Sequence, residues 1–453
     1  MSLEYFFNPK TVAVIGASRN PKKIGHVIFR NFLEGSFKGK VFPVNPNAKE
    51  IFGIKCSANI RDIKEKIDLA VISVPAKLVP EVLEDCGKKK TKAVIIISGG
   101  FKEIGNIHLE DQVCRTIKRY NLRVIGPNCI GVFDPYSGVD TFFLPRYKLE
   151  RPAKGDIAFI SQSGALGSVV LDWMAMKGYK ISRFISYGNA VDVDEADLME
   201  YLSKDKETKV ICAYLEGVKE GRKFYKIAKK ASKKKPVIVL KAGKTHEGTK
   251  AVSSHTGSLA GSSLVCSSVF KQAGIIEAES LEQLFDFARV FSNQPKPKGK
   301  RIQIITDGGG FGVLTTDWII KNKLLLAAMT EETKQELKKA FPAHVVIKNP
   351  LDLTGDADAE RYKTAIEACL KDKNIDMIAV IILFQIPTLT AEIVDVVSAL
   401  SERKKKPIIV IAAGGRYTEV LKKSLEDSGV PCFSYPEKAA QALRALYEYG
   451  GGK

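Results

Sequence analysis

The chain has 453 residues, 45% of them hydrophobic and 27% charged, and a formal net charge of +19. One core rarely serves more than about 200 residues, so this length predicts two to four domains, with three as the working number. The longest apolar stretch, 377–384, is far shorter than the ~20 residues that span a bilayer, and we expect no membrane segment. Because the chain does not open with a basic region followed by an apolar one, we expect a cytoplasmic location.

The charge and the cysteines argue against several classes of protein. The lysines are spread in short runs such as 88–90, and nothing resembles a module that reads bases, so a solvated basic surface is favoured over nucleic-acid binding. Such surfaces are common in heat-adapted proteins, and polyanions such as CoA, phosphate and nucleotides could use part of the charge. The eight cysteines form no Cys-x-x-Cys pair, which predicts neither a disulfide framework nor a metal site.

Short β-branched runs alternate with amphipathic stretches from the N-terminus onward. The runs 11–15, 69–74 and 93–98 each lead into Gly, Pro or Ser. This pattern is typical of βαβ units and predicts an α/β fold with parallel sheets. In such sheets ligands bind at the carboxyl ends of the strands, so the residues just after each run are where we expect the chemistry.

We expect three domains: a Rossmann-like unit over 1–150, and two flavodoxin-like units over 151–295 and 299–453, with a Pro, Lys and Gly-rich linker before the third. The last two resemble diverged copies of each other, because four landmarks recur in the same order. These are a strand running into a small-residue turn (157–164 and 302–309), an Asn three residues before an Asp (Asn189 and Asn349), an apolar strand (210–215 and 377–384), and Lys-Lys-Lys-Pro before a final strand (233–236 and 404–407).

The turn after the first strand, 16–25, opens a helix and is a candidate phosphate-binding turn, because backbone N–H groups and the helix dipole attract anions there. The second strand ends in Asn45-Pro46, where an NAD site has an acidic residue, which argues against a nicotinamide cofactor. The basic residues Arg19, Lys22, Lys23 and Lys49 suit CoA with its additional 3′-phosphate. An ordinary tight turn with solvated lysines is the alternative.

Three other turns contain a glycine where a phosphate could bind. Gly243-Lys244-Thr245 is not a P-loop, because Ile238 stands where the first glycine is required. The turn 308–312 suits tight packing and a phosphate cradle equally. The turn 161–164 precedes a helix whose free N–H groups attract phosphate, each contact contributing about 0.3 to 1 kcal/mol, and a plain serine N-cap is the alternative. No G-x-S-x-G motif surrounds Ser163, which argues against a serine hydrolase.

The run 244–262 is almost free of core-forming residues and is predicted to be a functional surface loop. His255, in a Ser, Thr and Gly setting, could attack a phosphoryl group, because a neutral imidazole has a pKa near ~6.5 and needs no separate base at pH 7. From the residues alone, a single loop histidine is more often without a function.

Over nearly its whole length the chain resembles the α subunits of succinyl-CoA synthetase and of ADP-forming acetyl-CoA synthetase. The motifs that carry the resemblance are the Gly16-Ala17-Ser18 turn, Asn45-Pro46, Val74-Pro75, Ser98-Gly99-Gly100-Phe101, Gly126-Pro127-Asn128-Cys129, Ser161-Gln162-Ser163-Gly164, Tyr214-Leu215-Glu216-Gly217 and Ser254-His255-Thr256-Gly257. The resemblance implies that His255 is phosphorylated and that Glu216 orients its imidazole. It implies that phosphate is bound by Gln162, Ser163 and Gly164, and CoA by Gly16, Ser18, Arg19, Lys23, Lys49, Val74, Pro75, Ser98, Gly99 and Asn128.

Two departures from the succinyl enzyme matter. Its α subunits have Gly-His-Ala-Gly where this chain has 254–257, and they end after the second domain. The third unit here resembles the C-terminal domain of the succinyl enzyme's β subunit, an arrangement found in the ADP-forming acetyl-CoA synthetases. These residues include no ATP-grasp domain. The resemblance therefore implies an ATP-grasp β subunit on another chain, in an α2β2 assembly, that holds ADP or ATP with Mg²⁺.

The implied reaction starts from acyl-CoA and phosphate, passes through an acyl phosphate, and transfers the phosphoryl group through His255 to ADP on the partner. The sequence does not identify the acyl group. A CoA-binding regulatory module is one alternative, and it would need neither His255 nor Glu216. A basic nucleic-acid-binding protein is the other, and its binding would depend steeply on salt.

Overall fold

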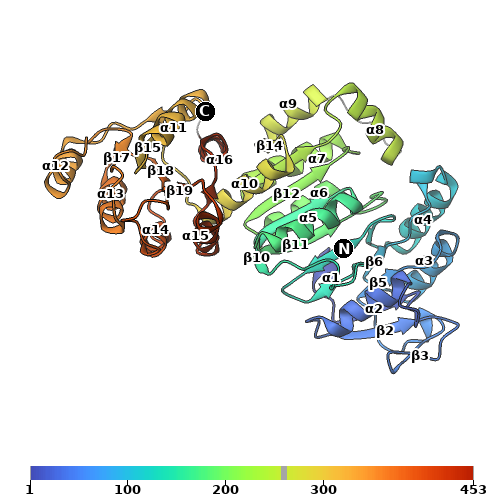
Figure 1. The fold of residues 1–453 in the computed structure, drawn as a ribbon. Coiled ribbons are helices and arrows are strands. Elements are labelled where there is room, and N and C mark those ends of the chain that lie inside the picture. Colours follow the sequence, from blue (N-terminus) through green and yellow to red (C-terminus); the bar gives the residue numbers. More distant parts are fainter. Residues whose placement is uncertain (1, 257–262, 452–453) are drawn as a thin grey trace. The chain divides into compact units, whose positions relative to one another are not determined.

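The computed structural model describes residues 2–256 and 263–451, without the side chains of 253–256 and 263. The chain divides into two compact units, Met1–Glu279 and Ser280–Lys453. Unit 1 contains two large sheets and a small hairpin, and unit 2 contains one sheet, with helices on the sheet faces (Figure 1). The predicted α/β fold class is confirmed, and the division into 1–150, 151–295 and 299–453 stays a prediction.

The first sheet of unit 1 is parallel throughout, and β-branched residues fill its buried strands. Strand β2 lies on one side of β1, and β5, β6 and β7 follow on the other side, so the order of the strands reverses beside β1. Ligands bind at such a reversal, at the carboxyl edge. In spatial order the strands are β2 (Lys40–Val44), β1 (Thr11–Ile15), β5 (Leu69–Ile72), β6 (Ala93–Ile96) and β7 (Val124–Ile125). The hairpin is β3 (Glu50–Ile51) with β4 (Ile54–Lys55), and the helices are α1 (Glu4–Phe7), α2 (Ile24–Glu34), α3 (Val79–Lys88), α4 (Ile107–Tyr120) and the short η1 (Ile60–Asp62), η2 (Ala76–Leu78) and η3 (Lys102–Ile104).

The second sheet of unit 1 combines five parallel strands with an antiparallel edge. That edge comes from residues 131–140, which precede the second expected domain in the sequence. In spatial order the strands are β14 (Ile276–Ala278), β13 (Val237–Lys241), β12 (Val210–Leu215), β10 (Lys154–Ser161), β11 (Ile181–Ser186), β8 (Gly131–Asp134) and β9 (Val139–Asp140). The helices are α5 (Gly164–Met176), α6 (Glu195–Lys204), α7 (Gly221–Ser232), α8 (His246–Thr256) and α9 (Ser263–Ala273).

The sheet of unit 2 repeats the order of the five parallel strands of the second sheet, as expected of diverged copies. In spatial order its strands are β16 (Leu325–Leu326), β15 (Arg301–Thr306), β18 (Met377–Ile381), β19 (Ile408–Ile411) and β20 (Cys432–Phe433), and β17 (Leu351–Asp352) also pairs with β15. The helices are α10 (Leu281–Asn293), α11 (Gly309–Lys321), α12 (Glu331–Ala340), α13 (Ala359–Lys371), α14 (Glu392–Glu402), α15 (Arg416–Asp427) and α16 (Pro436–Tyr449).

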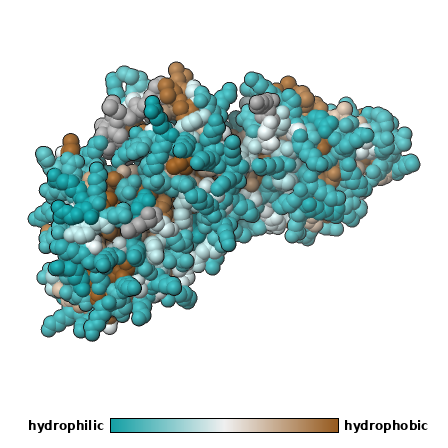
Figure 2. All heavy atoms as spheres, turned by 180° about the vertical axis from the view of Figure 1, so that it is seen from behind, coloured by the Kyte–Doolittle hydropathy of each residue, from teal (hydrophilic) through white to brown (hydrophobic). Residues whose placement is uncertain are grey.

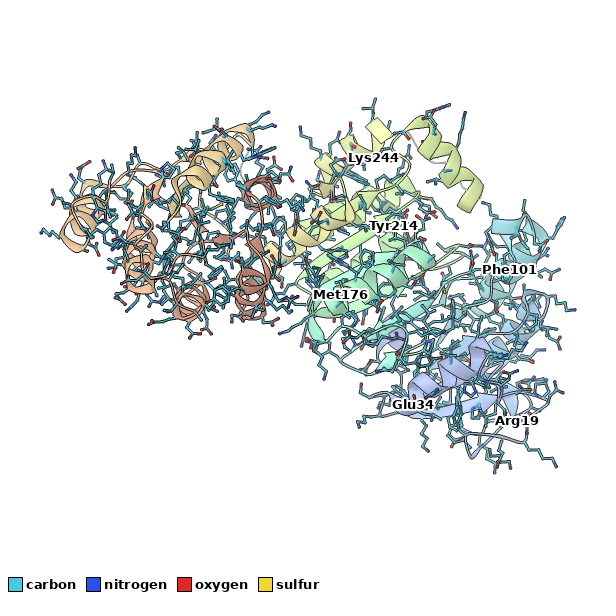
Figure 3. The ribbon with its side chains drawn as sticks, in the orientation of Figure 1. Arg19, Glu34, Phe101, Met176, Tyr214 and Lys244 are labelled. Atoms are coloured by element: carbon cyan, nitrogen blue, oxygen red, sulfur yellow. The ribbon has the colours of Figure 1, made fainter. Side chains whose placement is uncertain are left out.

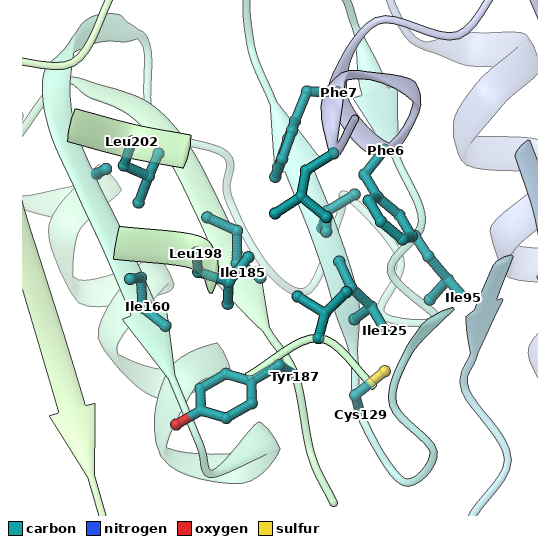
Figure 4. Close-up of a cluster of buried hydrophobic side chains, with 14 of the residues drawn as sticks. Phe6, Phe7, Ile95, Ile125, Cys129, Ile160, Ile185, Tyr187, Leu198 and Leu202 are labelled. Atoms are coloured by element: carbon teal, nitrogen blue, oxygen red, sulfur yellow. The ribbon is translucent and has the colours of Figure 1, made fainter. Parts of the chain in front are cut away.

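One apolar cluster joins the two sheets of unit 1. Phe6 and Phe7 of α1 are fully buried in it, together with Ile125 of the first sheet and Ile185 of the second (Figure 4). Burying such side chains contributes roughly 1.5 to 3 kcal/mol each. The cluster therefore holds the two sheets in one arrangement. Outside, the surface is largely hydrophilic (Figure 2), and among the described residues no helix combines the length and apolarity needed to cross a bilayer.

Gly25 lets α2 begin directly against the turn after β1. A Cβ on Gly25 would lie 1.9 Å from the carbonyl oxygen of Gly16, and both are backbone positions that cannot easily move apart. Gly25→Ala should lower the free energy of unfolding by at least about 1 to 3 kcal/mol, measured by urea denaturation. Gly221→Ala is the matched control, because nothing lies within 4 Å of its new Cβ. Equal losses in both variants would refute this account of the turn.

Candidate functional site

A cavity of ≈ 870 Å³ opens at the carboxyl ends of β1, β2, β5 and β6. Most of the residues predicted to bind CoA line it: Gly16, Ser18, Lys23, Val74, Pro75, Ser98 and Gly99. Arg19 and Lys49 are exposed and are not among the lining residues. Figure 3 shows Arg19 at the edge of unit 1 that carries α2 and β2, on the opposite side from Tyr214.

Hydrogen bonds tie the turns around this larger cavity to one another. Asn45, after β2, donates its Nδ2–H to the carbonyl oxygen of Ala17, after β1, at 2.7 Å. Ser98, after β6, donates its hydroxyl to the carbonyl oxygen of Val74, after β5, at 2.5 Å. Gly16 adopts φ +92°, and a Cβ there would lie 2.9 Å from the carbonyl oxygen of Ser73. Hydrogen bonds therefore connect the turns that form the rim of the larger cavity.

A polar pair on the wall of the larger cavity was missed by the sequence analysis. Asn59 donates its Nδ2–H to Oδ2 of Asp85 at 2.6 Å, and both residues line the cavity. Asp85 lies within the amphipathic helix α3, where a carboxylate is expected to face solvent. Asn59 is marked locally only as the N-cap of η1, in a capping box with Asp62, and tertiary packing alone brings it to Asp85.

A second cavity of ≈ 400 Å³ adjoins the first, and Ile24, Ile97, Ser98 and Gly99 line both. Its wall includes all three residues predicted to bind phosphate, namely Gln162, Ser163 and Gly164. Asn128, predicted to bind CoA, lines this second cavity and not the larger one. Among the lining residues that were not predicted, Lys102, Asn189 and Lys219 carry charged or amide side chains.

The start of α5 presents hydrogen-bond donors to the second cavity. Ser163 is the N-cap, and its Oγ accepts the N–H of Leu166 at 3.4 Å. The carbonyl Oε1 of Gln162 accepts the N–H groups of Glu216 and Gly217 at 2.7 and 3.0 Å. This fixes the amide, and its Nε2 donates to no described residue. The Gln162 amide and the unpaired N–H groups of the first helical turn are therefore available to an anion.

Glu216 lies at the end of β12 and is 3% exposed. Its backbone oxygen accepts from Lys241 Nζ at 2.9 Å. Burial, followed by the charge of Glu216 and the hydrogen bond to it, raises the pKa of Tyr214 to about 12. The carboxylate of Glu216 therefore lies beside the Tyr214 hydroxyl, and it lines neither cavity.

The expected loop over 244–262 was wrong for residues 246–256, which form α8. The Thr245 hydroxyl accepts the N–H of Gly248 at 3.0 Å and caps the first turn. Val252 is 7% exposed and packs towards Gly243, so one apolar residue anchors the helix. The imidazole of His255 and residues 257–262 lie outside the described residues. Helix α8 contacts η3, which carries Lys102 of the second cavity, and Figure 1 shows α8 on the same side of unit 1 as α4.

The two contacts of Gln162 predict different outcomes for two substitutions. Gln162→Leu would leave the N–H groups of Glu216 and Gly217 buried without an acceptor, which should cost about 1 to 3 kcal/mol of unfolding free energy. Gln162→Glu keeps the acceptor and should retain stability, but its negative charge should weaken phosphate binding. Urea denaturation measures the first effect and the KM for phosphate the second. Equal stability of both variants would rule out the acceptor role.

Buried Glu195 predicts a pH-dependent stability. Its side chain is 1% exposed, Oε1 has no partner, and burial raises its pKa to about 7. Because the folded state then binds the proton more tightly, the free energy of unfolding should fall as pH rises from about 4.5 to about 7, by roughly 3 kcal/mol. Glu195→Gln should remove this fall, measured by denaturation across that range. Glu200→Gln, on the exposed face of the same helix, should leave the fall in place.

Comparisons with known proteins indicate the same family over nearly the whole chain. Three family models match: a CoA binding domain over residues 10–135, a succinyl-CoA ligase like flavodoxin domain over 154–291, and a ligase-CoA domain over 302–452. The acetate–CoA ligase [ADP-forming] II subunit alpha of Pyrococcus furiosus is 42% identical, covering 99% of this chain and 99% of that protein. The acetate–CoA ligase [ADP-forming] of Methanocaldococcus jannaschii is 43% identical over 99% of this chain, which spans 63% of its length.

A solved structure is similar in fold as well as in sequence. It is the dinucleotide forming acetyl-coenzyme A synthetase 1 of Ca. Korarchaeum cryptofilum in complex with phosphate and ADP, with a TM-score of 0.94 and 39% identity over 100% of this chain and 97% of that one. Because the Pyrococcus alpha subunit is 42% identical over 99% of both proteins, this chain belongs to the family of ADP-forming acetate–CoA ligase alpha subunits, which are acid–thiol ligases.

Proposed function

We propose that the larger cavity binds CoA and that the second cavity brings phosphate to the acyl group of acyl-CoA. The observation that carries this proposal is the wall that the two cavities share at Ile24, Ile97, Ser98 and Gly99. A thioester whose CoA part fills the first cavity reaches the second across this wall. There the start of α5 and the Gln162 amide offer donors for an anion. The basic residues Lys23, Arg19 and Lys49 would serve the CoA phosphates.

The proposed chemistry has two steps on this chain. A phosphate oxygen attacks the thioester carbonyl carbon, a C–O bond forms, the C–S bond breaks, and CoA leaves as the thiol with the proton that phosphate gives up. A nitrogen of His255 then attacks the phosphorus atom, a P–N bond forms, the P–O bond to the acyl group breaks, and the acid leaves as its carboxylate. Both steps depend mainly on positioning and on stabilising charge.

Glu216 would orient the imidazole of His255 by accepting from its other ring nitrogen. Two observations support bringing them together: Glu216 follows β12 and donates its backbone N–H to Gln162 of the second cavity, and α8, which contains His255, contacts η3 beside the same cavity. The hydrogen bonds from Glu216 N–H to Gln162 and from Lys241 to the Glu216 carbonyl oxygen hold this strand end in place.

The phosphoryl group would pass from His255 to ADP on a partner chain. The Pyrococcus relative is named as an alpha subunit, and the Methanocaldococcus relative is a longer protein. We infer an ATP-grasp β subunit that holds ADP or ATP with Mg²⁺, an α2β2 assembly, and a cytoplasmic location. Acetate is the acid named for these relatives, and we propose a small carboxylic acid for this chain.

Labelled phosphate tests the proposal. The chain incubated with acyl-CoA and labelled phosphate should take up acid-labile label, and His255→Asn should abolish both the label and turnover with the partner. His246→Asn, at the exposed start of α8, is the matched control and should retain both. A CoA-binding regulatory module would bind CoA without any labelling. Turnover that survives His255→Asn would refute the phosphohistidine route.

A further inference from the structure

The wall of the second cavity carries two ammonium groups that form no ion pair with a described carboxylate. Lys102 and Lys219 both line it, and among the described residues neither lies within ion-pair distance of an Asp or Glu. Lys223, four residues further along the chain, does form ion pairs, because its ammonium lies 2.8 Å from both Asp194 and Asp197. Two unpaired positive charges facing one small cavity point to an anionic ligand.

Lys219 is fixed in place by the protein backbone. Its Nζ donates to the carbonyl oxygens of Asn189 at 2.5 Å and of Ala190 at 3.0 Å. An ammonium carries three N–H groups, so one remains for a ligand. Because the charge is held before the ligand arrives, little conformational freedom is lost when it binds.

Two carboxylates lie behind Asn189, outside the lining of the cavity. Asn189 donates its Nδ2–H groups to Glu103 at 2.7 Å and to Glu110 at 2.8 Å. Glu103 also accepts the N–H groups of Gly100 and Phe101. These carboxylates are therefore occupied in holding the turn, and the lysines are the charges that face the cavity.

The two lysines also repel each other. Burial lowers the pKa of Lys219, the charge of Glu110 raises it, the charge of Lys102 lowers it, and the charge of Glu195 raises it. A dianion between the two ammonium groups would relieve this repulsion, whereas a neutral ligand would not.

We propose that Lys219 binds a non-bridging oxygen of inorganic phosphate, and of the acyl phosphate formed from it, in the second cavity. This rests on the proposed function, because it assigns a residue to the phosphate of that reaction. Lys219 makes no covalent bond and exchanges no proton. It holds the phosphorus atom near the start of α5, where the thioester carbon and then the imidazole can reach it.

The test compares Lys219→Met with Lys219→Gln in the complex with the partner. Both remove the charge, but glutamine can still donate to the carbonyl oxygens of Asn189 and Ala190. Both should raise the KM for phosphate by about tenfold or more, while the KM for acyl-CoA stays within about twofold. Labelling of His255 from ATP through the partner should persist. Lys226→Met, which removes one exposed charge of α7 outside both cavities, should change neither KM.

The outcomes separate the possibilities. A raised KM for phosphate in both Lys219 variants supports the proposal. A raised KM in Lys219→Met alone means that Lys219 only braces the turn, and unchanged KM values in both mean that it does not contact phosphate. Either result overturns the inference while the His255-dependent labelling of the parent chain still upholds the proposed function. A parent chain that takes up no label at His255 would overturn both.

Discussion

The second cavity of unit 1 depends on the apolar cluster that joins its two sheets. Its wall combines the turn after β6 of the first sheet with the start of α5 from the second, so neither sheet forms it alone. The ring of Phe7 stacks on that of Tyr201 with 4.8 Å between centroids, so the short helix α1 packs against α6, which covers the second sheet. Close-packed interiors resist displacement. Burial of Phe6, Phe7, Ile125 and Ile185 therefore sets the distance between the turn at Ser98 and the turn at Ser163.

The turns themselves are joined by neutral groups. Amides and hydroxyls connect Asn45 to Ala17, Ser98 to Val74, and Gln162 to Glu216. Carboxylates could accept some of these hydrogen bonds, but their charge would repel phosphate. Around the second cavity the carboxylates lie outside the lining, with Glu103 and Glu110 behind Asn189 and Glu216 beside Tyr214. The wall of the second cavity thus stays open to anions, whereas Glu81 and Asp85 line the larger cavity.

How much the sequence could predict follows from how local each feature is. The turns at Gly16, Val74 and Ser98 were predictable, because parallel strands place their carboxyl ends on one edge whatever the helices do. Helix α8 was missed, because its formation depends on the Thr245 cap and on the contact of Val252 with Gly243. A polar run without an amphipathic stripe gives no such signal.

Residues that reach the site only through tertiary packing were also missed. Lys219 and Asn189 lie thirty positions apart and meet because β11 and β12 flank β10. Asn128 came close to its predicted place but lines the second cavity. The strands at 131–140 are too short for their pattern to show which sheet they join. In each case the deciding information is a contact distant in sequence.

The wall common to the two cavities has a consequence for how energy is conserved. On the proposed route the acyl carbon exchanges sulfur for oxygen while staying beside Ile97, Ser98 and Gly99. A mixed anhydride that is never released into bulk solvent has little opportunity to hydrolyse. Only the phosphoryl group then has to travel, and it leaves attached to the protein. The free energy of the thioester is thereby passed on to the nucleotide and is not dissipated as heat.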